Sequence, residues 1–189
     1  MKKLSVTGLC LAMLVSPVQT MADGGWRLLP DKKGGFKAEP SLSVMVGSLN
    51  PSVSGASSDT VVGFELSLNC PLLQPPSNKI RQQISLSTYS HKGLEITTIE
   101  LNPHYVIETS SGVSVGLGPG IGYLQAETAT DKEGMFALQV GASIHYTAMD
   151  FMFLGAEARY QWTQDHTFPT QSQRGADNFR FALKAGVNF

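Results

Sequence analysis

The last twelve residues of the chain alternate strictly between two kinds of side chain. The odd positions are apolar, and they are Phe179, Phe181, Leu183, Ala185, Val187 and Phe189. The even positions are polar or small. A repeat of two residues over this length is typical of a β-strand with one apolar face and one polar face. The final segment is therefore predicted to be an amphipathic strand that ends on an aromatic residue.

Seven earlier segments show the same alternation. They are residues 41–48, 61–70, 79–89, 94–107, 113–124, 135–146 and 151–162. Most are close to the ~9–11 residues that a tilted strand needs to cross a membrane. In the fourth segment Leu94 and Ile96 fall out of phase, which predicts a bulge or a shifted start, and Pro103 removes one ladder hydrogen bond. The predicted fold is all-β, an eight-stranded antiparallel up-and-down barrel.

The amino terminus has the features of a secretory signal. Met1, Lys2 and Lys3 supply a positive start, residues 4–18 are mostly apolar, and Thr20 and Ala22 place small residues at a cleavage site. We expect a cleaved signal peptide at 1–22, a flexible N-terminal segment at 23–40 and the barrel at 41–189. In the second segment Trp26, Leu28 and Leu29 are candidates for a membrane anchor or for a cap on the barrel mouth.

Composition excludes several classes of function. The formal net charge of −1 is unsuited to a nucleic-acid partner. Cys70 is the one cysteine beyond the signal, so no intramolecular disulfide is expected. Beyond the signal, no apolar run approaches the ~18 residues of a spanning helix. A membrane protein with this sequence has to cross as a closed barrel, because every backbone group must be satisfied internally.

The polar face of the predicted strands carries many charges among small residues. Alternation alone fits a soluble carrier with an apolar interior as well as a membrane barrel with a polar one. Charges interleaved with Gly, Ser, Asn and Gln favour a polar interior, in which acids and bases from neighbouring strands pair. The predicted charge network in the barrel lumen comprises Glu65, Arg81, Glu100, Glu157, Arg159, Arg180 and Lys184.

Aromatic residues are predicted to gather at the two ends of the strands. Tyr123, Phe136, Tyr160, Trp162 and Phe179 fall at the outer ends, and Tyr146 and Phe189 fall at the inner ends. Two such belts are the girdles that a transmembrane barrel places at the membrane interfaces.

The connections are predicted to be short at the inner end and long at the outer end. With the first strand running outward, residues 71–78, 108–112 and 147–150 are inner turns. Residues 49–60, 90–93, 125–134 and 163–177 are then outer loops. Two connections disagree with the expected lengths, because 71–78 is long for an inner turn and 90–93 is short for an outer loop.

Several motifs resemble those of the small outer-membrane barrel superfamily, which includes opacity-type adhesins, outer membrane protein A-type domains and outer membrane protein W-type channels. They are LNPHYVIE, GVSVGLGPGIGYLQAE, LGAEARYQW and the closing FALKAGVNF. The family's glycine-rich strand followed by Tyr corresponds to Gly116, Gly118, Gly120, Gly122 and Tyr123. Its penultimate-strand Arg-Tyr pair corresponds to Arg159 and Tyr160. No peptidoglycan-binding domain follows Phe189, so a wall-anchoring role is not expected.

The resemblance implies a cellular location and partners. It places the chain in the outer membrane of a Gram-negative bacterium, in contact with membrane lipid and lipopolysaccharide. It implies that the barrel-assembly machinery reads the terminal Phe189. The outer loops, above all 163–177 and 49–60, are then the expected contact surface for host or envelope partners.

No cofactor or metal site is predicted. The glycines of 116–122 recur on one strand face and are not followed by a helix, unlike a phosphate-binding loop. The four histidines show no metal-ligand spacing. Ser143, His145 and Glu157 share the polar face, but residues i and i+2 of a strand lie ~7 Å apart. We expect a non-enzymatic barrel with a mostly filled lumen and a structural or adhesin-like role. The alternatives are a narrow channel for small or hydrophobic molecules, then a lipid-A-modifying enzyme.

Overall fold

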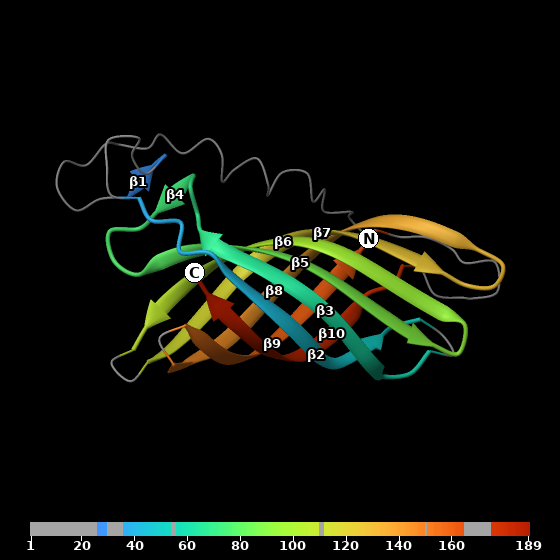
Figure 1. The fold of residues 1–189 in the computed structure, drawn as a ribbon. Helices are drawn as coiled ribbons and strands as arrows, with labels where there is room; N and C mark the ends of the chain where they lie inside the picture. The colour runs from blue at the N-terminus through green and yellow to red at the C-terminus, as the bar shows by residue number, and fades with distance from the viewer. Residues whose placement is uncertain (1–25, 30–35, 54–55, 110–111, 150, 165–174) are drawn as a thin grey trace.

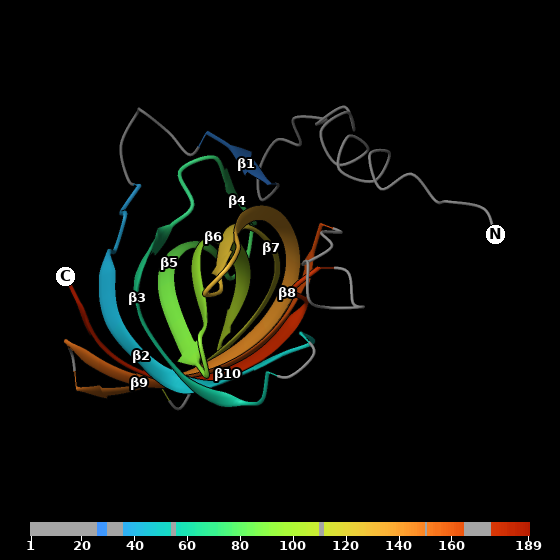
Figure 2. The ribbon, with the colours of Figure 1, turned by 90° about the vertical axis from the view of Figure 1, so that its right-hand side faces the viewer.

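The computed structural model describes residues 26–29, 36–53, 56–109, 112–149, 151–164 and 175–189. Eight antiparallel strands close into a barrel in the order β10-β2-β3-β5-β6-β7-β8-β9 (Figures 1 and 2). These strands are β2 (Ser41–Pro51), β3 (Asp59–Asn69), β5 (Lys79–His91), β6 (Leu94–Glu108), β7 (Val113–Glu127), β8 (Lys132–Met149), β9 (Met152–Thr163) and β10 (Asn178–Asn188). The predicted fold class is confirmed, with each predicted strand found close to its expected position.

The barrel is closed by its first and last strands. β10 pairs with β2 along its whole length, from Asn178 opposite Pro51 to Asn188 opposite Ser41. Every other barrel strand pairs with the barrel strand that follows it in the chain. This up-and-down order leaves no strand edge unpaired, which removes the need for a backbone partner from outside.

The alternation sets which side chains face inward. Along β10, Phe181 is 46% exposed whereas its neighbour Arg180 is 3% exposed, and the other strands repeat this pattern. Apolar side chains therefore cover the outside of the barrel and polar ones fill the inside. A protein in water would bury the opposite face, so this orientation is that of a transmembrane barrel. No helix among the described residues is long and apolar enough to cross a membrane.

The fourth predicted strand needs a correction. No bulge is present, because β5 and β6 pair in one continuous register from His91 opposite Leu94 to Lys79 opposite Val106. Leu94 and Ile96 break the pattern because both point into the barrel, where they are 7% and 1% exposed. The apolar face changes sides here since the outer end of the lumen is itself apolar.

The two prolines of neighbouring strands face each other. The register of β6 and β7 runs from Leu101 opposite Ile121 to Tyr105 opposite Leu117, which sets Pro103 opposite Pro119. Each lacks an N–H, so placing them together confines the lost hydrogen bonds to one spot. The strands approach closely there, and a Cβ on Gly118 would lie 1.9 Å from the Pro103 carbonyl oxygen.

Both connections of unexpected length have a structural explanation. The inner segment between β3 and β5 is long because it contains β4 (Leu73–Gln74), which pairs with β1 (Arg27–Leu28) in a separate two-stranded sheet (Figure 1). The β5–β6 connection is short because Lys92 and Gly93 form a two-residue turn with φ of 45° and 82°. Positive φ at both positions is the geometry of a tight hairpin turn.

The short N-terminal piece lies outside the barrel ladder. Trp26, Leu28 and Leu29 are exposed. Cys70 follows the end of β3 and is buried, and its backbone N–H donates to the carbonyl oxygen of Ile80. The predicted signal peptide, residues 1–22, lies outside the described residues, as do residues 23–25 and 30–35 of the predicted N-terminal segment.

Candidate functional site

The middle of the barrel interior holds a cluster of three acids and three bases. Glu65 comes from β3, Glu100 from β6 and Glu157 from β9, while Arg159 also lies on β9. Arg180 and Lys184 come from β10. All six are at most 3% exposed. The three carboxylates balance the three cations formally, which is the condition for keeping buried charges ionised.

Glu157 is the centre of this cluster. Its carboxylate accepts hydrogen bonds from Arg159 Nε and Nη2 at 3.0 and 2.8 Å. It also accepts from Arg180 Nη2 at 3.3 Å and from Lys184 Nζ at 2.6 Å. One carboxylate thus accepts hydrogen bonds from three cations, and each cation also contacts at least one further acceptor.

Two ion pairs extend the cluster across the lumen. Arg180 donates to both oxygens of Glu100, at 2.7 and 3.1 Å, in a bidentate pair. Lys184 Nζ donates to Glu65 at 2.5 Å. Because β10 is not next to β6 or β3 in the barrel, these contacts cross the interior and occupy it.

Neutral polar side chains complete the shell around the charges. Ser85 and Asn102 donate to Glu100 at 2.8 and 3.3 Å, and Gln139 donates to Asn102 at 2.8 Å. Ser87 accepts from Arg180 at 2.9 Å. These hydrogen bonds offset part of the cost of burying the ions, while Arg159 Nη1 and Arg180 Nε are buried with no hydrogen-bond partner among the described residues. Polar and charged side chains thus line the middle of the barrel interior.

Arg81 does not join this cluster, although it was predicted with it. Its guanidinium lies nearer the inner end and donates to neutral acceptors, among them Ser67 Oγ at 3.0 Å and the Glu39 carbonyl oxygen at 2.9 Å. A carboxylate is not among the acceptors described for it. The strand register explains this. Arg81 lies opposite Asn69 and His104, two residues closer to the inner end of β5 than Gln83, which accepts a hydrogen bond from Arg159 of the cluster.

The candidate Ser143, His145 and Glu157 are not brought together. Ser143 Oγ instead lies 3.2 Å from Nδ1 of His104, a residue on β6. The imidazole of His145 packs edge-on against Phe153, with ring centroids 5.4 Å apart. Glu157 is fully engaged by the cations. The Ser143–His104 pair is buried in the wall of the charge cluster, away from the lipid surface.

An apolar layer closes the outer end of the lumen, which the sequence analysis did not foresee. Its members are Leu49, Val53, Val61, Tyr89, Leu94, Ile96, Leu124, Ala126, Met135 and Ala176, each at most 7% exposed. Several strands switch their apolar residues to the inward phase near this end. That switch is visible in the sequence at Leu94, Ile96 and Leu124, and it was the signal available for finding the layer.

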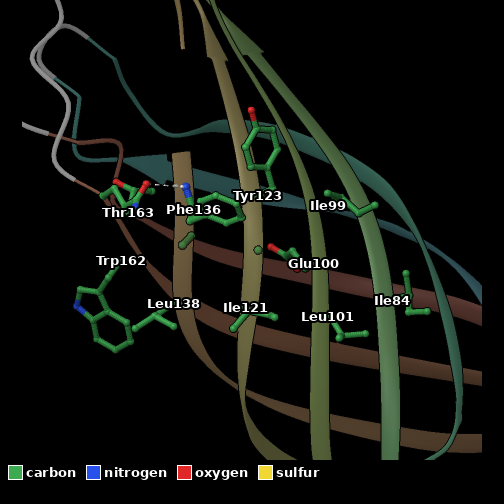
Figure 3. A pocket seen from close by; sticks show the side chains of 13 residues that line it. Ile84, Ile99, Glu100, Leu101, Ile121, Tyr123, Phe136, Leu138, Trp162 and Thr163 are labelled. Atoms are coloured by element: carbon green, nitrogen blue, oxygen red, sulfur yellow. Dashed lines mark hydrogen bonds between the residues drawn. The ribbon is translucent and has the colours of Figure 1, made fainter. Parts of the chain in front are cut away.

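Two hollows of very different character lie among the described residues. At the inner end, a pocket of about 300 Å³ is lined by Glu65, Arg81, His145, Phe153 and neighbouring residues. On the outside, a groove of about 830 Å³ runs over the apolar faces of β5 to β9 (Figure 3). Figure 3 shows Ile84, Leu101, Ile121 and Leu138 along this groove, with Trp162 beside Leu138. The outer groove is continuous with the lipid-facing surface.

The predicted aromatic residues lie on the outer face. Tyr123 is opposite Phe136, with ring centroids 5.4 Å apart in an edge contact, and Tyr160 and Trp162 are 4.8 Å apart. Phe179 pairs with Tyr160 across β9 and β10. All five residues lie in the outer halves of their strands. Tyr146 and Phe189 lie toward the inner end and are exposed.

Among the residues described, no group of three or more His, Cys, Asp or Glu side chains could hold a metal ion.

No protein-family model matches the chain, and no curated protein matches it. Solved structures with the same architecture do. Neisserial surface protein A superposes with a TM-score of 0.60 at 15% identity, covering 79% of this chain and 97% of its own.

Two further solved structures are similar over most of the barrel. The N-terminal β-barrel domain of OprF from Pseudomonas aeruginosa has a TM-score of 0.56 at 13% identity, covering 81% of this chain and 100% of its own. Ail, the attachment invasion locus protein of Yersinia pestis, has a TM-score of 0.53 at 16% identity, covering 82% and 100%. The chain has the fold of the small outer-membrane β-barrels.

The expected resemblance to the small outer-membrane barrels is thus confirmed at the level of fold. Identities of this size carry no information about activity, because this architecture hosts many functions. The lumen of this barrel contains two layers among the described residues. A layer of ion pairs lies in the middle, and a layer of apolar side chains lies at the outer end.

Proposed function

We propose that the chain is an integral outer-membrane protein of a Gram-negative bacterium, exported through a cleaved signal peptide at residues 1–22. Its barrel acts as a filled, non-conducting scaffold for the outer loops, which make structural or adhesin-like contacts with host or envelope partners. The proposal is supported by the outward apolar face, by the filled lumen and by the similarity of the fold to outer-membrane barrels, Ail among them.

The observation that carries the proposal is the double closure of the interior. Six charged side chains pair across the lumen, and above them a layer of apolar side chains excludes water. A conducting path would need a continuous column of water along the axis. An eight-stranded barrel is only just wide enough to hold its own side chains, so these two layers leave no room for one.

The position of the barrel in the outer membrane determines which molecules it contacts. The apolar face contacts membrane lipid, and at the outer leaflet it contacts lipopolysaccharide. Phe189 remains exposed at the end of β10, where the barrel-assembly machinery can read it. A Phe189→Ser variant is expected to lower the amount of folded protein in the outer membrane while leaving export through the inner membrane unchanged.

Single-channel recording in planar bilayers tests the filled scaffold. The wild-type protein is expected to show no steady conductance, and an Ile96→Ala, Leu124→Ala variant of the apolar layer is expected to show more openings than wild type. A steady wild-type conductance that Glu157→Ala or Arg159→Ala alters would instead establish the narrow channel. Folding of each sample is checked by its heat-dependent mobility on a gel, which a compact barrel shows.

A further inference from the structure

Three polar side chains meet at the outer end of the barrel, away from the lumen. His91 is the last residue of β5, Asp59 is the first residue of β3, and Ser57 lies just before it in the β2–β3 connection. His91 Nε2 lies 2.8 Å from Ser57 Oγ. On the opposite side of the ring, His91 Nδ1 contacts Asp59 Oδ2. One imidazole therefore bridges a hydroxyl and a carboxylate through its two nitrogens.

The chemistry of the partners fixes the roles of the two ring nitrogens. An ionised carboxylate only accepts hydrogen bonds, so Nδ1 carries the proton and donates it to Asp59. When the ring is neutral, Nε2 is the acceptor and the Ser57 hydroxyl donates to it. This arrangement of donors and acceptors prepares a serine for nucleophilic attack. The imidazole acts as the base for the hydroxyl, and the carboxylate holds the imidazole in the correct tautomer.

The surrounding structure holds all three groups in place. The Thr60 N–H donates to the second oxygen of Asp59 at 2.6 Å, which orients the carboxylate. The hydroxyl of Tyr89, a member of the buried apolar layer, donates to the Ser57 carbonyl oxygen at 2.6 Å. Ser57 is thereby tied to the rigid barrel, although it lies in a connection.

Exposure suits a reaction with a molecule from outside. Ser57 is exposed, whereas the His91 side chain is 16% exposed. The hydroxyl can reach a substrate while the base is largely sheltered from water. The next serine, Ser58, is also exposed, and the partner described for its hydroxyl is Ser48 Oγ, with no base among the described contacts, which makes it a matched control.

We propose that Ser57, His91 and Asp59 form a hydrolytic centre for carboxylic esters at the outer face of the barrel. Ser57 Oγ attacks the ester carbonyl carbon, and its proton passes to His91 Nε2. The carbon–oxygen bond to the alcohol breaks, and the leaving alkoxide takes that proton from His91. Water then attacks the acyl-serine, again giving a proton to His91, which returns it to Ser57 as the acid is released. The balance is ester plus water to acid plus alcohol.

A hydrolytic centre at this place would add an enzymatic activity to the scaffold role, whereas the sequence predicts a non-enzymatic barrel. It assigns to the outer connections an action on the molecules they contact. It does not depend on the state of the lumen, so a conductance result leaves it untouched. It also differs from the Ser143 candidate, whose serine is buried in the lumen and paired with another histidine.

The test uses the full-length protein, folded in detergent micelles and checked by its heat-dependent mobility. A fluorophosphonate probe is added, and the modified residue is identified by mass spectrometry of peptides. Hydrolysis of p-nitrophenyl esters is followed in parallel, with short acyl chains in solution and long chains in mixed micelles. Preference for the long chains would identify a membrane lipid as the source of the ester, and preference for the short ones a soluble molecule.

We expect the probe to attach to Ser57, and Ser57→Ala to lose both the label and at least about 100-fold in kcat/KM. Asp59→Asn is expected to keep the fold but lower kcat by a similar factor, since the imidazole would lose its correct tautomer. Ser58→Ala should stay within about twofold of wild type. Equal hydrolysis by wild type and Ser57→Ala, or equal labelling of Ser57 and Ser58, would overturn the proposal and leave the contacts a tie between the β2–β3 connection and β5.

Discussion

Arg180 on β10 and Glu100 on β6 form a bidentate ion pair across the barrel interior, at 2.7 and 3.1 Å, although they are 80 residues apart in the chain. Lys184 makes a second crossing to Glu65 on β3. These contacts join strands that are not neighbours in the sheet. They fix the cross-section of the barrel in addition to the hydrogen-bonded ladders.

Breaking this pair from one side is expected to be costly. Glu100→Gln removes the nearer of the two carboxylates that Arg180 contacts and leaves the buried cluster with an excess positive charge, which is expected to destabilise the protein by about 3–5 kcal/mol. Urea unfolding of the protein in micelles, followed by tryptophan fluorescence, measures the change. Glu127→Gln is the control, since the exposed Glu127–Lys132 pair at 2.8 Å should contribute no more than about 1 kcal/mol. Equal effects of the two variants would contradict this account of the lumen.

The glycines of β7 make different demands on space. Gly118→Ala would press a Cβ against the backbone of Pro103, and relief requires the strands to separate. In Gly122→Ala the nearest atom is the end of the Gln161 side chain, at 3.1 Å, which can move. We expect Gly118→Ala to reduce refolding yield and to cost about 1–3 kcal/mol or more, and Gly122→Ala to cost less. Refolding yield from gel mobility ranks them, and the reverse order would be inconsistent with the register.

The apolar layer is expected to behave as a protein core. Ile96→Ala leaves a cavity in it and should destabilise the barrel by about 2–5 kcal/mol. Ile99, three residues along β6, faces the lipid side and is 53% exposed, so Ile99→Ala creates no internal cavity. The same urea titration compares the two variants. A larger loss for Ile99→Ala would mean that Ile96 does not support the structure as its burial indicates.

The ion pair at the inner mouth predicts a pH dependence. Lys79 Nζ donates to Glu39 at 2.9 Å, and this hydrogen bond holds the pKa of the Glu39 carboxyl below its usual value. A depressed pKa in the folded state stabilises the protein above the unfolded pKa, and that contribution is lost as the pH falls through the folded pKa.

The wild-type protein should therefore have a larger free energy of unfolding than Glu39→Gln at pH 7. The two proteins should be equally stable at a pH low enough to protonate Glu39 in both the folded and the unfolded state. The side chains are 35% and 42% exposed, so the difference is at most about 1 kcal/mol and shrinks with added salt. Urea titrations at both pH values measure it. A difference that persists at low pH would assign the effect to packing.

Much of the architecture could be predicted from the alternation. Each strand of the barrel carries it, and a period of two allows one face to meet lipid and the other to meet the interior. Leu94 and Ile96 were misread because the rule assumes an interior that is polar along its whole length. The alternation placed Arg81 on the inward face but could not give its partners, because strand register decides how deep along the barrel a residue lies.

The sequence by itself determined the eight strands, the outward face of residues such as Phe181 and the inward face of residues such as Glu157. The tertiary structure alone decided which charges pair and where the lumen turns apolar. It also decided that Ser57 and Asp59 contact His91, which lies on a strand more than thirty residues later in the chain. The physical reason is that alternation is a property of local backbone geometry. Pairing across the lumen and between connections depends on the register and closure of all eight strands at once.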